Sequence, residues 1–209
     1  NLHDGVSNPY ERVMKALYNI LSSLDDDSQI PMYAFGNNIP GVGLNTCGQM
    51  SGVCATSLDD MINIYRNYTR QCFKSMSGPT YFSDVIRKQI DICKQEKLIE
   101  TTTHHTLVII TDGETTKEEL DKQAIIDASN YPISIIVVGV GDGNGGRAWK
   151  TMEKFDDDMT HYGRKFDNFQ FNYFPITSPD TEEKIISEII DTIEELPEQY
   201  KYCKQLGYI

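Results

Sequence analysis

The stretch TLVIITDGETT, from Thr106 to Thr116, decides the fold. Its apolar run, Leu107 to Ile110, is rich in branched residues, which is typical of a strand buried on both faces in a parallel sheet covered by helices. The run stops at Thr111-Asp112-Gly113, and a helix is predicted to begin near Thr116. Asp112 is therefore expected at the carboxyl end of a central strand, the edge at which open α/β sheets bind ligands.

The chemistry of Asp112 has two interpretations at this stage. A carboxylate at that edge suits a hard divalent cation or a proton transfer. Alternatively, Asp112 only shapes a turn, because Asp-Gly is a common turn pair whose Asp bonds nearby backbone amides.

Helices and strands alternate on both sides of this stretch. Strands are predicted over Ile30–Phe35, Ile133–Val140 and Phe166–Phe174, while residues 37 to 53 are predicted to form a long loop or an irregular edge hairpin. A first helix is predicted to begin after Asn8, where Glu11 can reach back to the cap. Further helices are predicted to begin after Thr56 or Ser57, beside Thr80, at Lys117 and at Thr181. Pro197 is expected to end the last helix and to leave a partly ordered tail. This order predicts an α/β fold, a three-layer, doubly wound and mostly parallel sheet flanked by helices.

Length and charge exclude several classes of protein. The 209 residues suit a single domain, 1–209, with a sizeable core. A net charge of −12 argues against binding to nucleic acid and against electrostatic docking on anionic lipid. The five cysteines have no C-x-x-C spacing, so we expect free thiols, no zinc site and a reducing, cytoplasmic compartment. The sequence begins without Met, and we expect upstream sequence to be missing.

Three enzyme motifs can be tested on the sequence. Aspartyl-phosphate chemistry needs a carboxylate two residues before Asp112, where Ile110 stands. A calcium loop from Asp142 to Glu153 fails because Arg147 occupies its required glycine position. The loop Gly141 to Gly146 matches G-x-G-x-x-G, with Asp167 further on, and stays open as a dinucleotide site although it follows a late strand.

Thr80 offers a second hard ligand at the edge where Asp112 is expected. It follows the turn Ser77-Gly-Pro79 at the start of a predicted helix, where its ordinary role would be an N-cap. A hydroxyl and a carboxylate together suit Mg²⁺ or Mn²⁺, which keep waters and accept an oxygen from outside. A partner's acidic side chain can fill such an open position, which gives metal-dependent adhesion without catalysis.

The chain resembles the von Willebrand factor A domain of the copine family and of the related plant RING-type ubiquitin ligases. The matching stretches run in family order over nearly the whole chain: Leu2-His3, Asn8–Glu11, Ile30–Gly36, Gly78–Thr80, Val108–Gly113, Tyr131–Gly143, Phe155–Asp157, Phe166–Phe171 and Leu196–Tyr200. From Phe155 to Phe171 the resemblance to the ligase-type domains is closer.

This resemblance implies a metal-ion-dependent adhesion site in an intracellular protein-interaction module. Thr80 and Asp112 match the family's ligands, Mg²⁺ (or Mn²⁺ or Ca²⁺) is the implied ion, and Gly113 and Glu114 are the expected partner-binding residues. The partner would be a protein that supplies an acidic side chain, and membrane recruitment would come only through domains not present in this sequence. No catalytic residue is expected.

The resemblance also leaves alternatives and a gap. The domain could recruit substrates for a RING-type ligase whose activity lies elsewhere, or, in a different class, be a nucleotide-dependent enzyme using Gly141 to Gly146. The family's remaining ligands, Asp-x-Ser-x-Ser, follow a central first strand for which this sequence holds no candidate. We therefore expect that strand to lie outside the sequence, between Ile30–Phe35 and Thr106–Asp112, and the segment alone not to fold stably.

Overall fold

The chain divides into two compact units, Asn1–Thr80 and Tyr81–Ile209. The computed structural model describes residues 8–39, 43–72, 80–98, 103–141, 149–159, 163–174 and 182–209. The elements of the first unit are α1 (Pro9–Leu21), β1 (Tyr33–Ile39), β2 (Gly43–Gln49) and α2 (Leu58–Cys72). Those of the second are α3 (Ser83–Leu98), β3 (His105–Thr111), α4 (Glu118–Ala128), β4 (Ile133–Val140), α5 (Lys150–Asp157), β5 (Phe169–Phe174), α6 (Glu182–Ile193) and α7 (Leu196–Gln205).

The start of α1 confirms the predicted cap and corrects the role of Glu11. Asn8 Oδ1 accepts a hydrogen bond from Glu11 N at 3.1 Å, and Pro9 occupies the first turn. The Glu11 carboxylate does not return to the cap but accepts two bonds, each 2.7 Å, from the Arg66 guanidinium of α2. A nearly buried carboxylate needs a charged partner, and the planar fork of Arg66 satisfies both oxygens at once.

The predicted strand Ile30–Phe35 is shifted toward the C-terminus. Ile30 makes an isolated bridge with Ala55, and the strand itself is β1, which pairs antiparallel with β2. Of the two interpretations of residues 37 to 53, the hairpin is therefore the correct one. Gly36, the residue after the predicted strand, lies within β1 at φ 73°, where the pairing register is irregular. Glycine adopts this backbone conformation without a steric penalty, so the strand bends there instead of ending.

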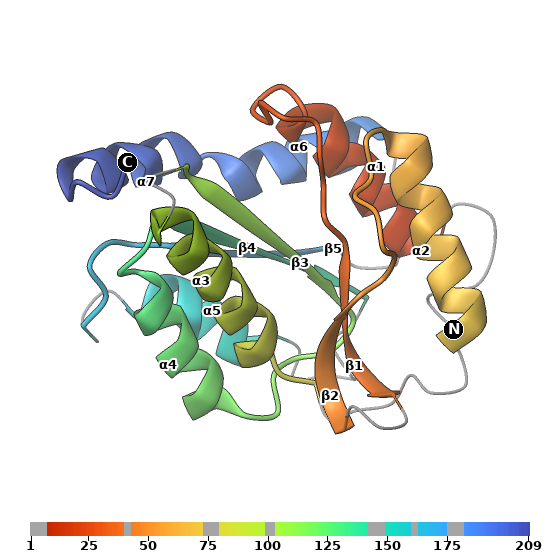
Figure 1. Ribbon diagram of the computed structural model, residues 1–209, viewed down its shortest axis with the longest axis horizontal. Helices are drawn as coiled ribbons and strands as arrows, with labels where there is room; N and C mark the ends of the chain where they lie inside the picture. The colour runs from red at the N-terminus through yellow and green to blue at the C-terminus, as the bar shows by residue number, and fades with distance from the viewer. Residues whose placement is uncertain are drawn as a thin grey trace. The chain divides into compact units, whose positions relative to one another are not determined.

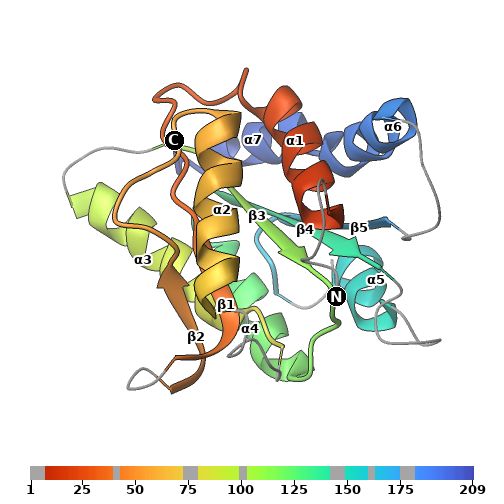
Figure 2. The ribbon, with the colours of Figure 1, turned by 90° about the vertical axis from the view of Figure 1, so that its right-hand side faces the viewer.

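The second unit holds the predicted parallel sheet. β3, β4 and β5 pair in that order, all parallel. Helices α6 and α7 lie on one face of these strands, while α3, α4 and α5 lie on the other (Figures 1 and 2). Every residue of β4 is buried. The predicted α/β class, with a parallel sheet flanked by helices, is confirmed.

The strand β3 is not central among the residues that the structure describes. It bonds only to β4, so β4 is the middle strand of the three. Only Ile109 and Thr111 of β3 are buried, and among the described residues the strand has a neighbouring strand on one side alone. Direct pairing of Ile30–Phe35 with Thr106–Asp112 would have contradicted the family topology, and the described strands do not pair in that way.

The prediction for the C-terminal region was wrong. Pro197 was expected to be followed by a partly ordered tail, but it lies at the start of a further helix, α7. It lies in the first turn of α7, where proline's missing N–H is no loss. Leu196, Gln199 and Cys203 are buried at helical spacing, and α7 packs on β4.

Four of the five cysteines fall where their side chains are described, and Cys54, Cys72, Cys93 and Cys203 are all free thiols. Burial raises the pKa of Cys93 to about 12, which keeps that thiol protonated and unreactive. No helix within the described ranges is long and apolar enough to cross a membrane.

Candidate functional site

The turn after β3 directs Asp112 outward. Thr111, which is buried, donates from Oγ1 to Gly113 O at 2.9 Å and accepts from Gly113 N at 3.2 Å. Because the threonine hydroxyl already satisfies this turn, the Asp112 side chain is not needed to close it. Asp112 is exposed and has no hydrogen bond or ion pair with any described residue. The alternative that Asp112 only caps backbone amides is therefore not what the turn shows.

The loop beyond Asp112 is tied to α5 by two acidic side chains. Glu114 accepts a short hydrogen bond at Oε1 from Thr151 N in the first turn of α5. Glu118 forms an ion pair with Lys154 of the same helix. The positive end of the helix dipole favours a carboxylate at that position. Glu114, expected to contact a partner, thus has one oxygen engaged within the domain.

Trp149 packs into the carboxyl half of β4 just before α5. Its side chain is fully buried, and its backbone has φ 69°. A Cβ placed on Gly139 would lie 2.7 Å from the indole, so only glycine fits beneath that ring. Residues 142–148, which precede Trp149, hold most of the G-x-G-x-x-G match and lie outside the described residues. The dinucleotide hypothesis is therefore not tested by the structure.

Thr80 is not the N-cap of α3, which begins at Ser83. The start of this helix is held instead by Asp121 of α4, whose Oδ1 accepts from Phe82 N at 2.8 Å and from Ser83 N at 2.6 Å. Thr80 ends the first unit and Asp112 lies in the second. Within the described residues, no three His, Cys, Asp or Glu side chains are grouped so that they could hold a metal ion.

The two histidines before β3 have structural partners. His105 pairs with Glu96 at 2.7 Å. His104 lies 3.1 Å from Ser134 Oγ and packs edge-on against Tyr200. Burial, together with the neighbouring His105, lowers the pKa of His104 to about 4 and keeps it neutral at pH 7. His104 directly precedes β3 and His105 is its first residue, so both histidines lie at the start of the strand.

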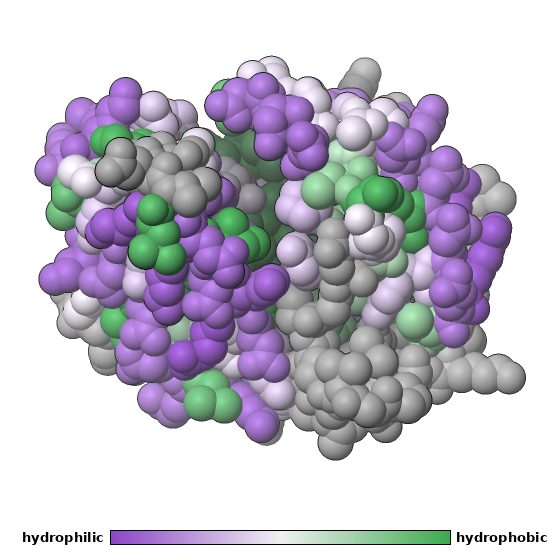
Figure 3. Space-filling view, viewed as in Figure 1, coloured by the Kyte–Doolittle hydropathy of each residue, from purple (hydrophilic) through white to green (hydrophobic). Residues whose placement is uncertain are grey.

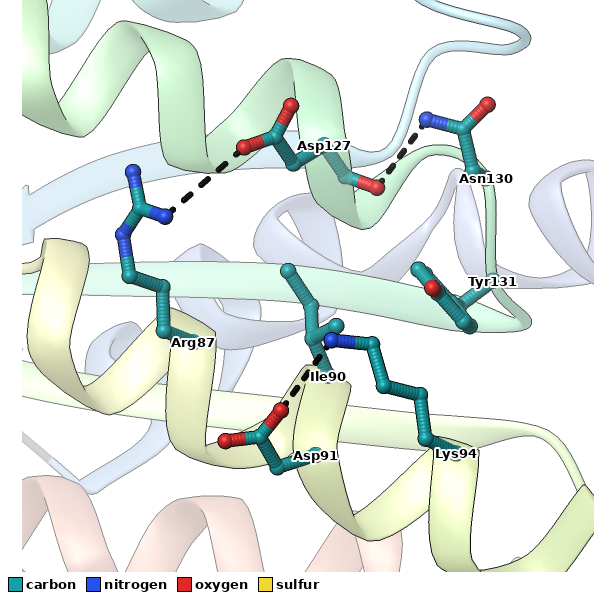
Figure 4. Close-up of a pocket in the computed structure, with 7 residues that line it drawn as sticks. All are labelled: Arg87, Ile90, Asp91, Lys94, Asp127, Asn130 and Tyr131. Carbon is teal, nitrogen blue, oxygen red and sulfur yellow. Dashed lines mark hydrogen bonds and ion pairs between the residues drawn. The ribbon is translucent and has the colours of Figure 1, made fainter. Parts of the chain in front are cut away.

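A hollow of about 410 Å³ lies between α3 and the end of α4, where Arg87, Ile90, Asp91, Lys94, Asp127, Asn130 and Tyr131 line it (Figure 4). Its charges pair with one another, Arg87 with Asp127 at 3.9 Å and Lys94 with Asp91 at 3.2 Å. Tyr131 precedes β4, whereas Asp112 follows β3, so the hollow lies at the opposite edge of the parallel sheet. The face over α3 and α4 is mostly hydrophilic, with hydrophobic surface only in separate spots (Figure 3). Neither feature adds a ligand for the candidate ion.

Comparison with known proteins identifies the family. The copine family model matches residues 1–209. The chain belongs to the copine family. "Copine family protein 2" of Caenorhabditis elegans is 36% identical over 205 residues, which are 97% of this chain and 2% of that protein. "E3 ubiquitin-protein ligase RGLG3" of Arabidopsis thaliana is 34% identical over 215 residues, 96% of this chain and 55% of the relative. "Protein BONZAI 1" of the same plant is 32% identical over 156 residues, 74% of this chain and 26% of the relative. The chain thus spans only part of each of these relatives.

The sequence did not reveal two polar features of this copine domain, a single buried acid and a cluster of four charged residues. One is Asp121, which stands among the acids Glu118 and Glu119 and looks like any charge in a first helical turn. The other, the Arg164 cluster, comprises Arg164, Asp156, Asp167 and Glu195. The Arg164 side chain is 1% exposed, with Nη1 2.8 Å from Asp167 Oδ1. No spacing in the sequence connects the members of the Arg164 cluster, because α5, the turn before β5 and the start of α7 bring them together.

Proposed function

We propose that this copine domain is a protein-interaction module that binds its partner through a divalent cation held by Asp112 and Thr80. The observation that carries the proposal is the state of Asp112, an exposed carboxylate at the carboxyl edge of the sheet with no partner among the described residues. A hard oxygen anion in that position fits Mg²⁺, Mn²⁺ or Ca²⁺. The homology to copines and to plant E3 ligases supports an interaction role.

The expected ligand is an acidic side chain on the surface of a partner protein. Mg²⁺, when bound, supplies open coordination positions that such a carboxylate oxygen can fill. Gly113 and Glu114 flank the ion in this proposal and contact the partner. Gly113 is buried, so its backbone is what it can offer, and the second oxygen of Glu114 has no hydrogen-bond partner among the described residues.

The test is Mg²⁺ binding by the full-length protein, measured by calorimetry, for the parent and for Asp112→Ala. We expect saturable binding that Asp112→Ala weakens at least tenfold, because the carboxylate ligand that this chain supplies is lost, while the circular dichroism spectrum is unchanged. Asp26→Ala is the matched control, since Asp26 is also exposed and without a partner among the described residues. Equal Mg²⁺ affinity in the parent and Asp112→Ala would refute the proposal.

A second candidate is that the same surface recruits substrates to a ubiquitin ligase. The observation that favours it is the 34% identity to a protein named as an E3 ubiquitin-protein ligase, which extends over 96% of this chain. In this case Asp112→Ala in the full-length protein would lower ubiquitin transfer to the bound substrate. It would leave self-ubiquitination intact, because transfer itself would belong to another part of the protein.

A further inference from the structure

Asp121 is a fully buried carboxylate in the first half of α4. Burial of an ionised group is costly unless donors surround it. Its Oδ1 accepts two backbone N–H groups at the start of α3, from Phe82 and Ser83, while Oδ2 has no hydrogen-bond partner among the described residues. Burial raises the pKa of Asp121, and the Thr115 hydroxyl, these two amides and the Ser83 hydroxyl act against that rise.

These contacts connect two separate parts of the sequence. On one side, Asp121 performs the capping role that Phe82, an apolar and fully buried residue, cannot perform for α3. On the other side, Thr115 belongs to the loop that begins at Asp112. Thr80 is joined to Phe82 through a single residue, Tyr81.

We propose that Asp121 is a positioning residue of the candidate adhesion site, which fixes the start of α3 and thereby the backbone that carries Thr80. This inference rests on the proposed function, because it gives Asp121 a role in ion binding without contact with the ion. Outer residues that hold ligands in place typically contribute tenfold to hundredfold to metal affinity. Removing the carboxylate would release Phe82 and Ser83 and let the Thr80 hydroxyl move from its binding position.

The experiment compares three variants of the full-length protein by Mg²⁺ calorimetry and by NMR of the Thr80 amide and methyl group. Asp121→Ala removes the acceptor, whereas Asp121→Asn keeps an acceptor oxygen for the two amides. Asn168→Ala is the structural control, because Asn168 is equally buried and its Nδ2 also bonds to α4, at Ile125 O. We expect at least tenfold weaker Mg²⁺ binding and shifted Thr80 signals in Asp121→Ala, with both restored within threefold of the parent in Asp121→Asn.

The control separates positioning from general destabilisation. Asn168→Ala should lower the thermal midpoint about as much as Asp121→Ala while leaving Mg²⁺ affinity and the Thr80 signals unchanged. Equal losses of affinity in the two alanine variants would overturn the positioning role. If the parent protein binds no Mg²⁺, the proposed function fails by itself. Asp121 is then judged on the Thr80 signals, and signals unmoved by Asp121→Ala would overturn its role as well.

Discussion

The contact between Gly139 of β4 and the Trp149 side chain shows how one residue limits which side chain fits at another position. The indole covers the glycine so closely that a methyl group has no space, and both residues belong to the second unit. The close contact fixes Trp149 directly before α5, the helix that Glu114 and Glu118 also contact. The loop after β3 and the end of β4 are therefore held by the same short helix.

Gly139→Ala is expected to lower the free energy of unfolding by about 1–3 kcal/mol, the usual cost of adding a methyl group to a filled core. Urea unfolding followed by the fluorescence of Trp149, the single tryptophan, measures the change. Gly52→Ala is the control, followed by circular dichroism, because a Cβ at Gly52 meets no atom within 4 Å. A Gly139→Ala variant as stable as the parent would show that the ring moves aside at no cost.

The Arg164 cluster belongs to the scale of elements, because α5, the turn before β5 and the start of α7 meet in it. Asp167 contacts the Arg164 guanidinium, and the charges of Asp156 and Glu195 also act on it. Arg164 Nε and Nη2 have no hydrogen-bond partner among the described residues. Burial, and then the neighbouring charges of Glu195, Asp157 and Asp167, raise the pKa of Asp156 to about 7, while the Phe171 backbone amide opposes the rise. Burial also raises the pKa of Asp167 and of Glu195.

The direction of the pH effect follows from the raised pKa of Asp156. Between about pH 4 and pH 7 the carboxyl group of Asp156 is ionised in the unfolded chain but protonated in the folded chain. Its contribution to the free energy of unfolding therefore falls as the pH rises through this range, and it stays constant above about pH 7. The full shift corresponds to at most about 4 kcal/mol. Asp156→Asn removes the titration and keeps an acceptor for the Phe171 amide.

We therefore expect Asp156→Asn to be more stable than the parent at pH 7.5 by about 1–4 kcal/mol, with the difference vanishing near pH 4. Urea unfolding at several pH values measures it. Asp158→Asn, a change at an exposed acid that follows α5, should show no such pH-dependent difference. A constant difference between Asp156→Asn and the parent across this range would contradict the assignment of the titration to Asp156.

The elements also show what periodicity can and cannot predict. The apolar run Ile133–Val140 was predicted to its end residues, because a strand with neighbours on both sides is buried throughout. The run before Asp112 has the same composition, yet its place in the order of strands depends on partners that a single run does not reveal. Pro197 was misplaced for a related reason, since a proline that ends one helix and a proline in the first turn of the next look alike in sequence.

The candidate site also has features that the sequence could predict and features that it could not. The sequence predicted that Asp112 follows a strand, and Asp112 does follow β3, at the carboxyl edge of the sheet, where it is exposed. It did not predict that Thr111 satisfies the turn or that Asp121 holds the start of α3. Those contacts join residues distant in sequence, and their polar side chains have no spacing that distinguishes them from ordinary surface acids.

At the scale of the whole molecule, the net charge of −12 attracts every cation, so a specific ion site must be separated from general screening. A ligand that binds only the folded state stabilises it by mass action, by about 2.7 kcal/mol when its concentration is 100 times its Kd. The proposed site therefore predicts that Mg²⁺ raises the thermal midpoint of the full-length protein beyond the rise produced by NaCl of equal ionic strength.

Two further variants decide whether this excess belongs to the proposed ligands. Thr80→Ala and Asp112→Ala should each remove it, since each deletes one of the two oxygen ligands that this chain is proposed to supply, while both keep the rise due to NaCl. Asp26→Ala, which changes the net charge by the same amount as Asp112→Ala, should keep the Mg²⁺-specific rise. If Thr80→Ala retains the full excess while Asp112→Ala loses it, the ion is held at the end of β3 without the start of α3, and the proposed pair of ligands is wrong.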